Sequence, residues 1–147
     1  MKPPTSYRVQ AQVAAGGVAT VTAGNQTIPV DAMWAADEPS GTPGRAELLA
    51  AAFAACLMKN LERSGALLSF RYEHADIDVR ARRQDIPPKF VEIEYELRLV
   101  TDEDERRVDL VHRNLRQFGT VYNTLAAVCD VHGSVVIVPT AADPPQP

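Results

Sequence analysis

The chain has 147 residues, of which 46% are hydrophobic and 23% are charged, so it is long enough to bury the core of one globular domain. Its net charge of −4 argues against a nucleic-acid partner, because binding to phosphates requires a basic surface. Two cysteines are too few for a disulfide scaffold, and the N-terminal segment lacks the apolar core of a secretory signal. We therefore expect a cytoplasmic protein with a single domain over residues 1–139 and a disordered, proline-rich tail over residues 140–147.

The N-terminal part of the chain predicts three short strands joined by local turns. Residues 7–13 alternate in polarity, which is the period of a half-buried strand, and two glycines follow as a turn. Residues 18–22 form the next strand segment, and residues 26–30 form the third after another glycine turn. Connections this short favour an antiparallel meander, after which residues 35–41 are expected to form a loop.

An alanine-rich run over residues 43–65 predicts the central helix of the protein. Thr42 is suited to the N-cap, and Gly65 is suited to a left-handed termination. Over residues 46–58 every side chain except that of Glu47 is apolar. A helix that is apolar on all sides is a buried one, and this run is shorter than the roughly 20 apolar residues that a membrane span needs. We expect no membrane association.

The C-terminal part predicts two long strands, two helices and a last strand. Residues 74–82 and 90–100 alternate in polarity and flank a Pro-Pro turn, so they are expected to pair. Thr101 and the acidic residues 102–104 resemble a capping box and precede a helical pattern, and a shorter helical piece follows at 121–128. The buried strand at 134–138 closes an α+β fold of antiparallel sheets around the central helix. Such a helix is hard to bury within one copy, which favours a homodimer.

This element order, with PGRAELLAAAFAACL inside the central helix, resembles the OsmC/Ohr family of osmotically inducible and organic-hydroperoxide-resistance proteins. The family's helix carries a proline, acidic residues, a leucine-rich turn and an alanine-rich run that ends in the reactive cysteine. Here the matching residues are Pro43, Glu47, Leu48, Leu49 and Cys56. A second stretch, residues 118–125, is similar to the family's Cys-Pro-Val-Ser-x-x-Leu element. The resemblance covers nearly the whole chain.

The resemblance implies an OsmC-like fold, an intertwined homodimer whose two sheets enclose the paired central helices, and thiol peroxidase chemistry. In active members the helix cysteine, here Cys56, attacks an organic hydroperoxide and becomes a sulfenic acid. A second cysteine condenses with it to a disulfide, which an external dithiol reduces. An arginine and a glutamate activate the first thiol. No cofactor and no metal are implied.

Three of these catalytic positions differ in this sequence. Ala46 stands where the family has its glutamate, and Glu47 lies about 100° around the helix from that position. The N-terminal strands lack the family's arginine, which leaves Arg45 as a candidate from the loop side. Gly119 aligns with the resolving cysteine, whereas the rival alignment puts Cys129 there. Glu47, Arg45 and Cys129 are therefore candidates for displaced catalytic roles.

Each candidate also has a structural interpretation. Cys56 is either a reactive nucleophile or a buried inert thiol, since free cysteine is commonly a small core residue. A structural role is favoured for Cys129, and a helix-start charge for Glu47. Cys129 and His132 offer only two metal ligands where a site needs three or four, so we expect no metal. The alternative function is a non-catalytic domain that binds a small apolar ligand in a dimer-interface pocket.

Overall fold

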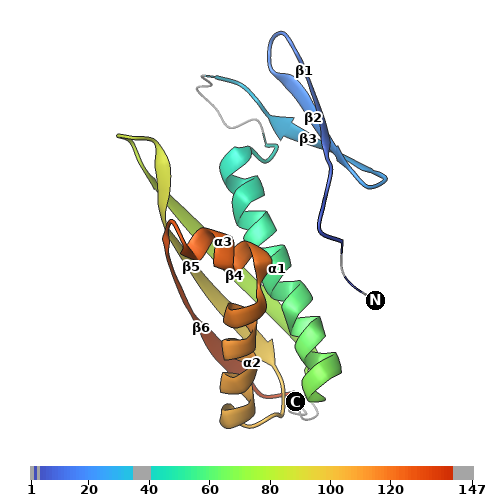
Figure 1. Cartoon of the computed structure of the whole chain (residues 1–147), viewed down its shortest axis with the longest axis vertical. Coiled ribbons are helices and arrows are strands. Elements are labelled where there is room, and N and C mark those ends of the chain that lie inside the picture. Colours follow the sequence, from blue (N-terminus) through green and yellow to red (C-terminus); the bar gives the residue numbers. More distant parts are fainter. Residues whose placement is uncertain (1, 3, 35–40, 141–147) are drawn as a thin grey trace, which may run out of the picture. The chain divides into compact units, whose positions relative to one another are not determined.

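The computed structural model describes residue 2, residues 4–34 and residues 41–140. The expected tail beyond residue 140 and the expected loop at 35–40 lie outside the described residues. The element order is the predicted one, with three strands, a helix, two strands, two helices and a last strand (Figure 1). The elements are β1 (Gln10–Ala14), β2 (Val18–Ala23), β3 (Gln26–Asp31), α1 (Arg45–Leu68), β4 (His74–Gln84), β5 (Lys89–Val100), α2 (Glu105–Phe118), α3 (Thr120–Ala126) and β6 (Asp130–Val138).

The described chain forms two compact units, which we call the N-terminal unit (Met1–Leu49) and the C-terminal unit (Ala50–Pro147). The N-terminal unit holds the predicted meander, an antiparallel sheet in the order β1-β2-β3. Gly16 and Gly17 make its first turn with φ angles of 102° and 94°, which residues other than glycine rarely adopt. That the two units belong to one domain stays a prediction.

Helix α1 ends later than the sequence predicts. It continues through Gly65 to Leu68, so the expected termination at Gly65 is wrong. The left-handed residue is Ser69, with φ 50°. The Arg107 guanidinium donates to the carbonyl of Leu68 at 2.6 Å, which satisfies one of the carbonyl groups that a helix end leaves free. A side chain about 40 residues away in the sequence therefore fixes this end, and local propensity cannot reveal it.

The sheet of the C-terminal unit has the order β4-β5-β6. Strands β4 and β5 form the predicted antiparallel hairpin, with Ile77 opposite Leu97. Strand β6 instead joins β5 in parallel, with Gly133 opposite Tyr95. A parallel neighbour needs a crossover connection, and α2 and α3 supply it. The α+β class is confirmed, and this one pair differs from the expected antiparallel arrangement.

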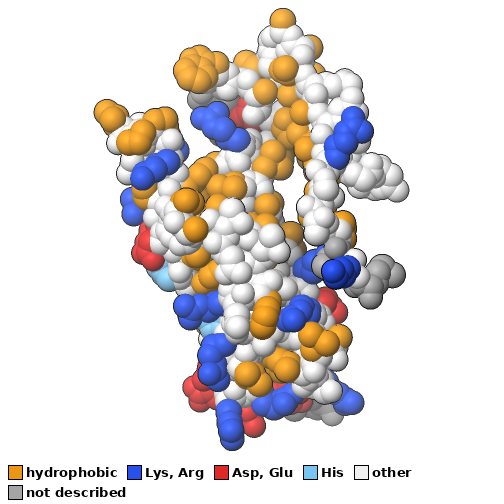
Figure 2. Space-filling view, viewed as in Figure 1, with side chains coloured by type: hydrophobic (Ala, Val, Ile, Leu, Met, Phe, Trp, Pro, Cys, Tyr) orange, Lys and Arg blue, Asp and Glu red, His pale blue; other side chains and the backbone are white. Residues whose placement is uncertain are grey.

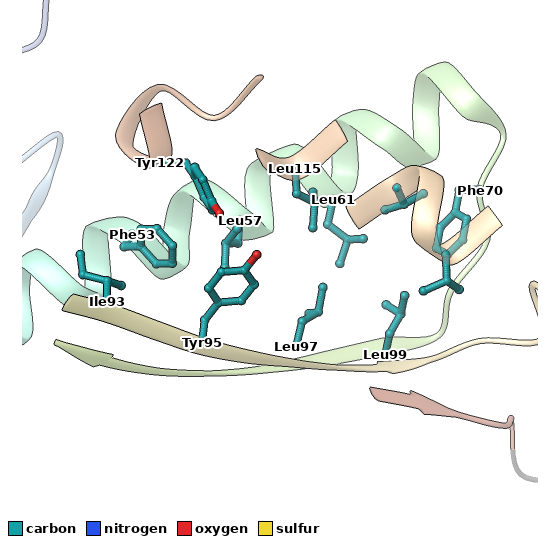
Figure 3. Close-up of a cluster of buried hydrophobic side chains, with 12 residues drawn as sticks. Phe53, Leu57, Leu61, Phe70, Ile93, Tyr95, Leu97, Leu99, Leu115 and Tyr122 are labelled. Carbon is teal, nitrogen blue, oxygen red and sulfur yellow. The ribbon is translucent and has the colours of Figure 1, made fainter. Parts of the chain in front are cut away.

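The core of the C-terminal unit lies between α1 and the inner face of its sheet (Figure 3). Alternate residues of β5 point inward, as its polarity pattern predicts. Residues from α1, α2 and α3 pack against them. The fully or nearly fully buried members are Phe53, Leu57, Leu61, Phe70, Ile93, Tyr95, Leu97, Leu99, Val108, Val111, Leu115 and Tyr122.

Only one face of α1 is buried in the described chain. Its buried residues are Phe53, Leu57, Asn60, Leu61 and Ser64. On the opposite face Ala51, Ala55 and Met58 are exposed, and they recur at the i, i+4, i+7 spacing of a single helical stripe. None of the helices in the described ranges combines the length and the apolarity needed to cross a membrane.

Candidate functional site

The thiol of Cys56 lies on α1 at the edge of the buried face, where it is partly exposed and packs against the hydrophobic core. Asn60 follows one helical turn later, so the two side chains share a face. The Asn60 side-chain amide donates to Cys56 Sγ at 3.7 Å, and Asn60 itself is only 9% exposed. A buried amide that points at sulfur supplies a hydrogen-bond donor for a thiolate. Sequence reasoning missed this residue, although the i, i+4 spacing could have revealed it.

Gly119 is also close to the Cys56 thiol. It separates α2 from α3 and has an extended backbone, with φ −81° and ψ 116°. A Cβ atom added at Gly119 would lie 3.0 Å from Cys56 Sγ, 2.8 Å from Tyr122 Cβ and 3.0 Å from the carbonyl oxygen of Leu115. The absence of a side chain therefore allows the α2–α3 junction to approach Cys56 closely.

Cys129 has different neighbours. Its thiol donates to the carbonyl oxygen of Phe90 at 3.3 Å, and its backbone N–H donates to Leu125 at 2.8 Å. It stands just before β6, at the end of the sheet where β5 begins. Both cysteines are free thiols. The structure thus brings Gly119 and Asn60 to Cys56, and it gives the Cys129 thiol a partner on β5.

Arg45 and Glu47 form the first turn of α1 and belong to the N-terminal unit. Glu47 lies near Gly44, with its Oε2 atom 3.5 Å from the position of a Cβ added there. The neighbours of Cys56 described above all come from the C-terminal unit. The catalytic roles of Arg45 and Glu47 stay predictions.

Tyr95 and His112 bring polar side-chain atoms close to Phe53, which lies one turn of α1 before Cys56. The hydroxyl of Tyr95 lies 2.7 Å from His112 Nε2, and the Tyr95 and Phe53 rings are 5.6 Å apart. Burial raises the pKa of Tyr95, and a hydrogen bond with Tyr122 raises it further. His112 is half-buried. His112 is one position after the buried Val111 on α2, so a helical wheel places it at the border of the apolar stripe.

The environment of His112 makes the stability of the fold depend on pH. Burial lowers the pKa of His112, and Arg116 lowers it further, while Asp109 opposes the shift. The unfolded chain therefore takes up a proton near the ordinary histidine value of about 6.5, and the folded chain does so only at lower pH. We expect the free energy of unfolding, measured by urea denaturation, to fall between about pH 7.5 and about pH 5.5, by at most about 1.4 kcal/mol per pH unit from this group.

Two substitutions test the origin of this dependence. His112→Gln should flatten the loss of stability on acidification. His132→Gln should steepen it, because a hydrogen bond with Glu92 raises the pKa of His132 and so stabilises the folded state at low pH. An unchanged pH slope in His112→Gln would show that His112 is not the responsible group.

Three groups that could hold a metal ion meet on the outer face of the sheet. Within the described ranges, one ligand atom each of Glu92, Asp130 and His132 lie within 4.8 Å of one another. His132 Nε2 is 3.0 Å from Glu92 Oε2, and Arg82 Nε is 3.1 Å from Glu92 Oε1. Both hydrogen bonds lower the pKa of Glu92, and the one with His132 has the larger effect. Since Arg82 already neutralises Glu92, this cluster is best explained as surface ion pairs.

The comparisons with known proteins agree on the fold. A family model described as "OsmC-like protein" matches residues 39–132, well over half of the chain. The structure of an OsmC like protein from Mycoplasma pneumoniae matches with a TM-score of 0.80 at 16% identity, over 93% of this chain and 99% of that one. An organic hydroperoxide resistance protein OsmC from Legionella pneumophila matches with a TM-score of 0.72 at 16% identity, over 90% and 99%. The organic hydroperoxide resistance protein OhrB of Bacillus subtilis matches with a TM-score of 0.66 at 15% identity, over 88% and 98%. A search of curated protein sequences gives no match.

Proposed function

The chain belongs to the OsmC-like protein family, and on that premise we propose that it reduces organic hydroperoxides with Cys56 as the attacking thiol. One observation carries the proposal. Cys56 is a partly exposed residue, and its sulfur accepts a hydrogen bond from the side-chain amide of the buried Asn60. Two of the structures that this chain resembles are named for organic hydroperoxide resistance.

The proposed chemistry requires Cys56 to react as a thiolate. Cys56 is in the middle of α1, beyond the reach of the helix dipole at the first turn. Asn60 supplies an N–H donor that favours the charged sulfur, and a neutral donor of this kind stabilises a thiolate less than an arginine does. We therefore propose a peroxidase that is slower than one whose thiolate faces an arginine.

The proposed assembly is a homodimer in the cytoplasm. The stripe of Ala51, Ala55 and Met58 is exposed on α1 and is apolar. Alanines let two helix backbones approach closely, so a second copy of α1 is a suitable partner for this stripe. The proposed reaction needs no metal or cofactor, because the peroxide is the oxidant and an external thiol is the reductant.

The experiment compares cysteine variants in the reduction of cumene hydroperoxide with dithiothreitol as reductant. We expect Cys56→Ser to lower the rate to that of the free thiol, because the attacking sulfur is lost. Cys129→Ser is the matched control and should keep most of the rate, since its thiol contacts Phe90. If wild type and Cys56→Ser react equally, the proposal is wrong. Native mass spectrometry for a co-purifying apolar molecule would then test the alternative of a ligand-binding domain.

A further inference from the structure

We propose that the oxidised Cys56 is reduced directly by a small thiol that carries carboxylates, of the glutathione type, and not by a second cysteine of the same chain. This inference rests on the proposed function. It starts from the two positions that could hold a resolving thiol. A Cβ at Gly119 would lie 3.0 Å from the sulfur, but the residue has no thiol, and the Cys129 thiol donates to the Phe90 carbonyl instead.

The geometry at Gly119 is that of a disulfide partner. In a disulfide with an S–S bond of about 2.04 Å, the Cβ of one cysteine lies about 3.0 Å from the sulfur of the other. The Cβ position of Gly119 is 3.0 Å from Cys56 Sγ. A cysteine at residue 119 could therefore close a disulfide, and the glycine leaves an intermediate on Cys56 without that internal partner.

The environment of Cys56 favours a small anionic thiol over a protein dithiol. Cys56 is only partly exposed, and its sulfur lies close to the α2–α3 junction, where a slender molecule can approach more easily than a folded domain. Arg63 lies seven residues after Cys56, two turns along the same face of α1. Its guanidinium stacks on the Phe118 ring at 4.5 Å and donates to Asn114 at 2.9 Å, and its side chain is exposed.

Glu62 precedes Arg63 on α1 and lies on another side of the helix from Cys56. Glu62 is about 120° around the helix from Cys56 and accepts a hydrogen bond from the Tyr72 hydroxyl. Lys59 is exposed one turn after Cys56. Figure 2 shows Lys and Arg side chains along α2, together with Asp and Glu side chains toward its lower end. A carboxylate-bearing thiol is therefore attracted to the Cys56 side of α1.

The reaction balances in three steps. The Cys56 thiolate attacks the outer oxygen of the hydroperoxide, so that an S–O bond forms and the O–O bond breaks. The sulfur loses two electrons and becomes a sulfenic acid, and the departing alkoxide takes a proton from solvent to become an alcohol. The small thiolate then attacks the sulfenic sulfur, an S–S bond forms, and the hydroxyl group leaves as water after taking a proton. A second small thiolate attacks the outer sulfur, which releases Cys56 and the oxidised small disulfide. The sum is one peroxide and two thiols to one alcohol, one water and one disulfide.

The test oxidises the full chain with one equivalent of cumene hydroperoxide and divides the sample before peptide mapping by mass spectrometry. Dimedone, which labels sulfenic acid, should mark Cys56. Glutathione should give a mixed disulfide at Cys56 in wild type and equally in Cys129→Ser. With Arg63→Gln at low salt, the mixed disulfide should form about two- to fivefold more slowly with glutathione, and no more slowly with the cationic thiol cysteamine.

The outcomes separate this inference from the proposed function. Absence of the dimedone adduct overturns both. A Cys56–Cys129 disulfide that forms in wild type without added thiol overturns the inference alone. The inference is also overturned if dimedone labels Cys56 but glutathione does not modify it, because that result would indicate a protein dithiol as the reductant. Equal slowing of glutathione and cysteamine by Arg63→Gln overturns the preference for an anionic thiol.

Discussion

Gly133→Ala is expected to destabilise the C-terminal unit by about 3 kcal/mol or more, because there is no room for a methyl group at this position. Gly133 pairs with Tyr95 across β5 and β6. An added Cβ would lie 2.4 Å from Tyr95 Cγ and 2.4 Å from the Tyr95 carbonyl oxygen. The ring could turn away only by leaving the core and its bond to His112, and the carbonyl could move only by distorting the sheet. Urea denaturation at neutral pH measures the effect.

Gly65→Ala is the matched control for this prediction. Gly65 is also in a regular element of the C-terminal unit, inside α1. A Cβ there meets only the Phe70 carbonyl oxygen, at 3.4 Å, which is ordinary contact. Since alanine favours a helix over glycine by about 1 kcal/mol, this variant should be neutral or more stable. Equal effects of the two substitutions would contradict the steric argument at Gly133.

Much of the fold could be predicted because its signals are local. The alternation in β5 places Ile93, Tyr95, Leu97 and Leu99 on one face, and all four are buried. The acidic start of α2 is a true N-cap, in which the Asp104 side chain accepts from the Arg107 backbone N–H. Periodicity and capping depend on neighbours in the sequence, so one sequence is enough to reveal them.

The rest depends on residues that are distant in the sequence. The parallel pairing of β6 depends on how α2 and α3 cross the sheet, and polarity does not encode that direction. His112 is half-buried because the Tyr95 hydroxyl meets it from another element. The apolar run in α1 predicted that the helix would be buried on all sides. Within one chain, only the face that carries Phe53 and Leu57 is buried.

In the candidate site too, the residues could be predicted from local sequence patterns, but their contacts could not. The helix signature singled out Cys56, and the alignment of residues 118–125 singled out Gly119, so both came from the sequence. The closeness of Gly119 to Cys56 could not be predicted from the sequence, because it brings the α2–α3 junction to α1. Asn60 was missed although its i, i+4 spacing from Cys56 placed the two side chains on one helix face; the spacing does not show that the amide donates to sulfur.

Gly119→Cys is expected to form a disulfide with Cys56 and to remove the need for an external resolving thiol. The extended backbone at Gly119 is open to any residue, and its Cβ position is 3.0 Å from Cys56 Sγ. The bond would close a loop of roughly 60 residues, so the oxidised form should be more stable than the reduced form by about 4 kcal/mol before any strain is subtracted. Thiol titration after mild oxidation, with urea denaturation of both redox forms, measures both effects.

The strain comes from Tyr122, whose Cβ would be 2.8 Å from the new one, so α3 must shift by a few tenths of an ångström. Gly119→Ala introduces the same Cβ without sulfur and measures that cost by itself. We expect oxidised Gly119→Cys to keep one free thiol per chain, at Cys129, and to resist modification by glutathione. If the variant folds as Gly119→Ala does and still titrates with three free thiols after oxidation, residue 119 is not close enough to Cys56 in solution to resolve it. The glycine at this position would then have no bearing on how oxidised Cys56 is reduced.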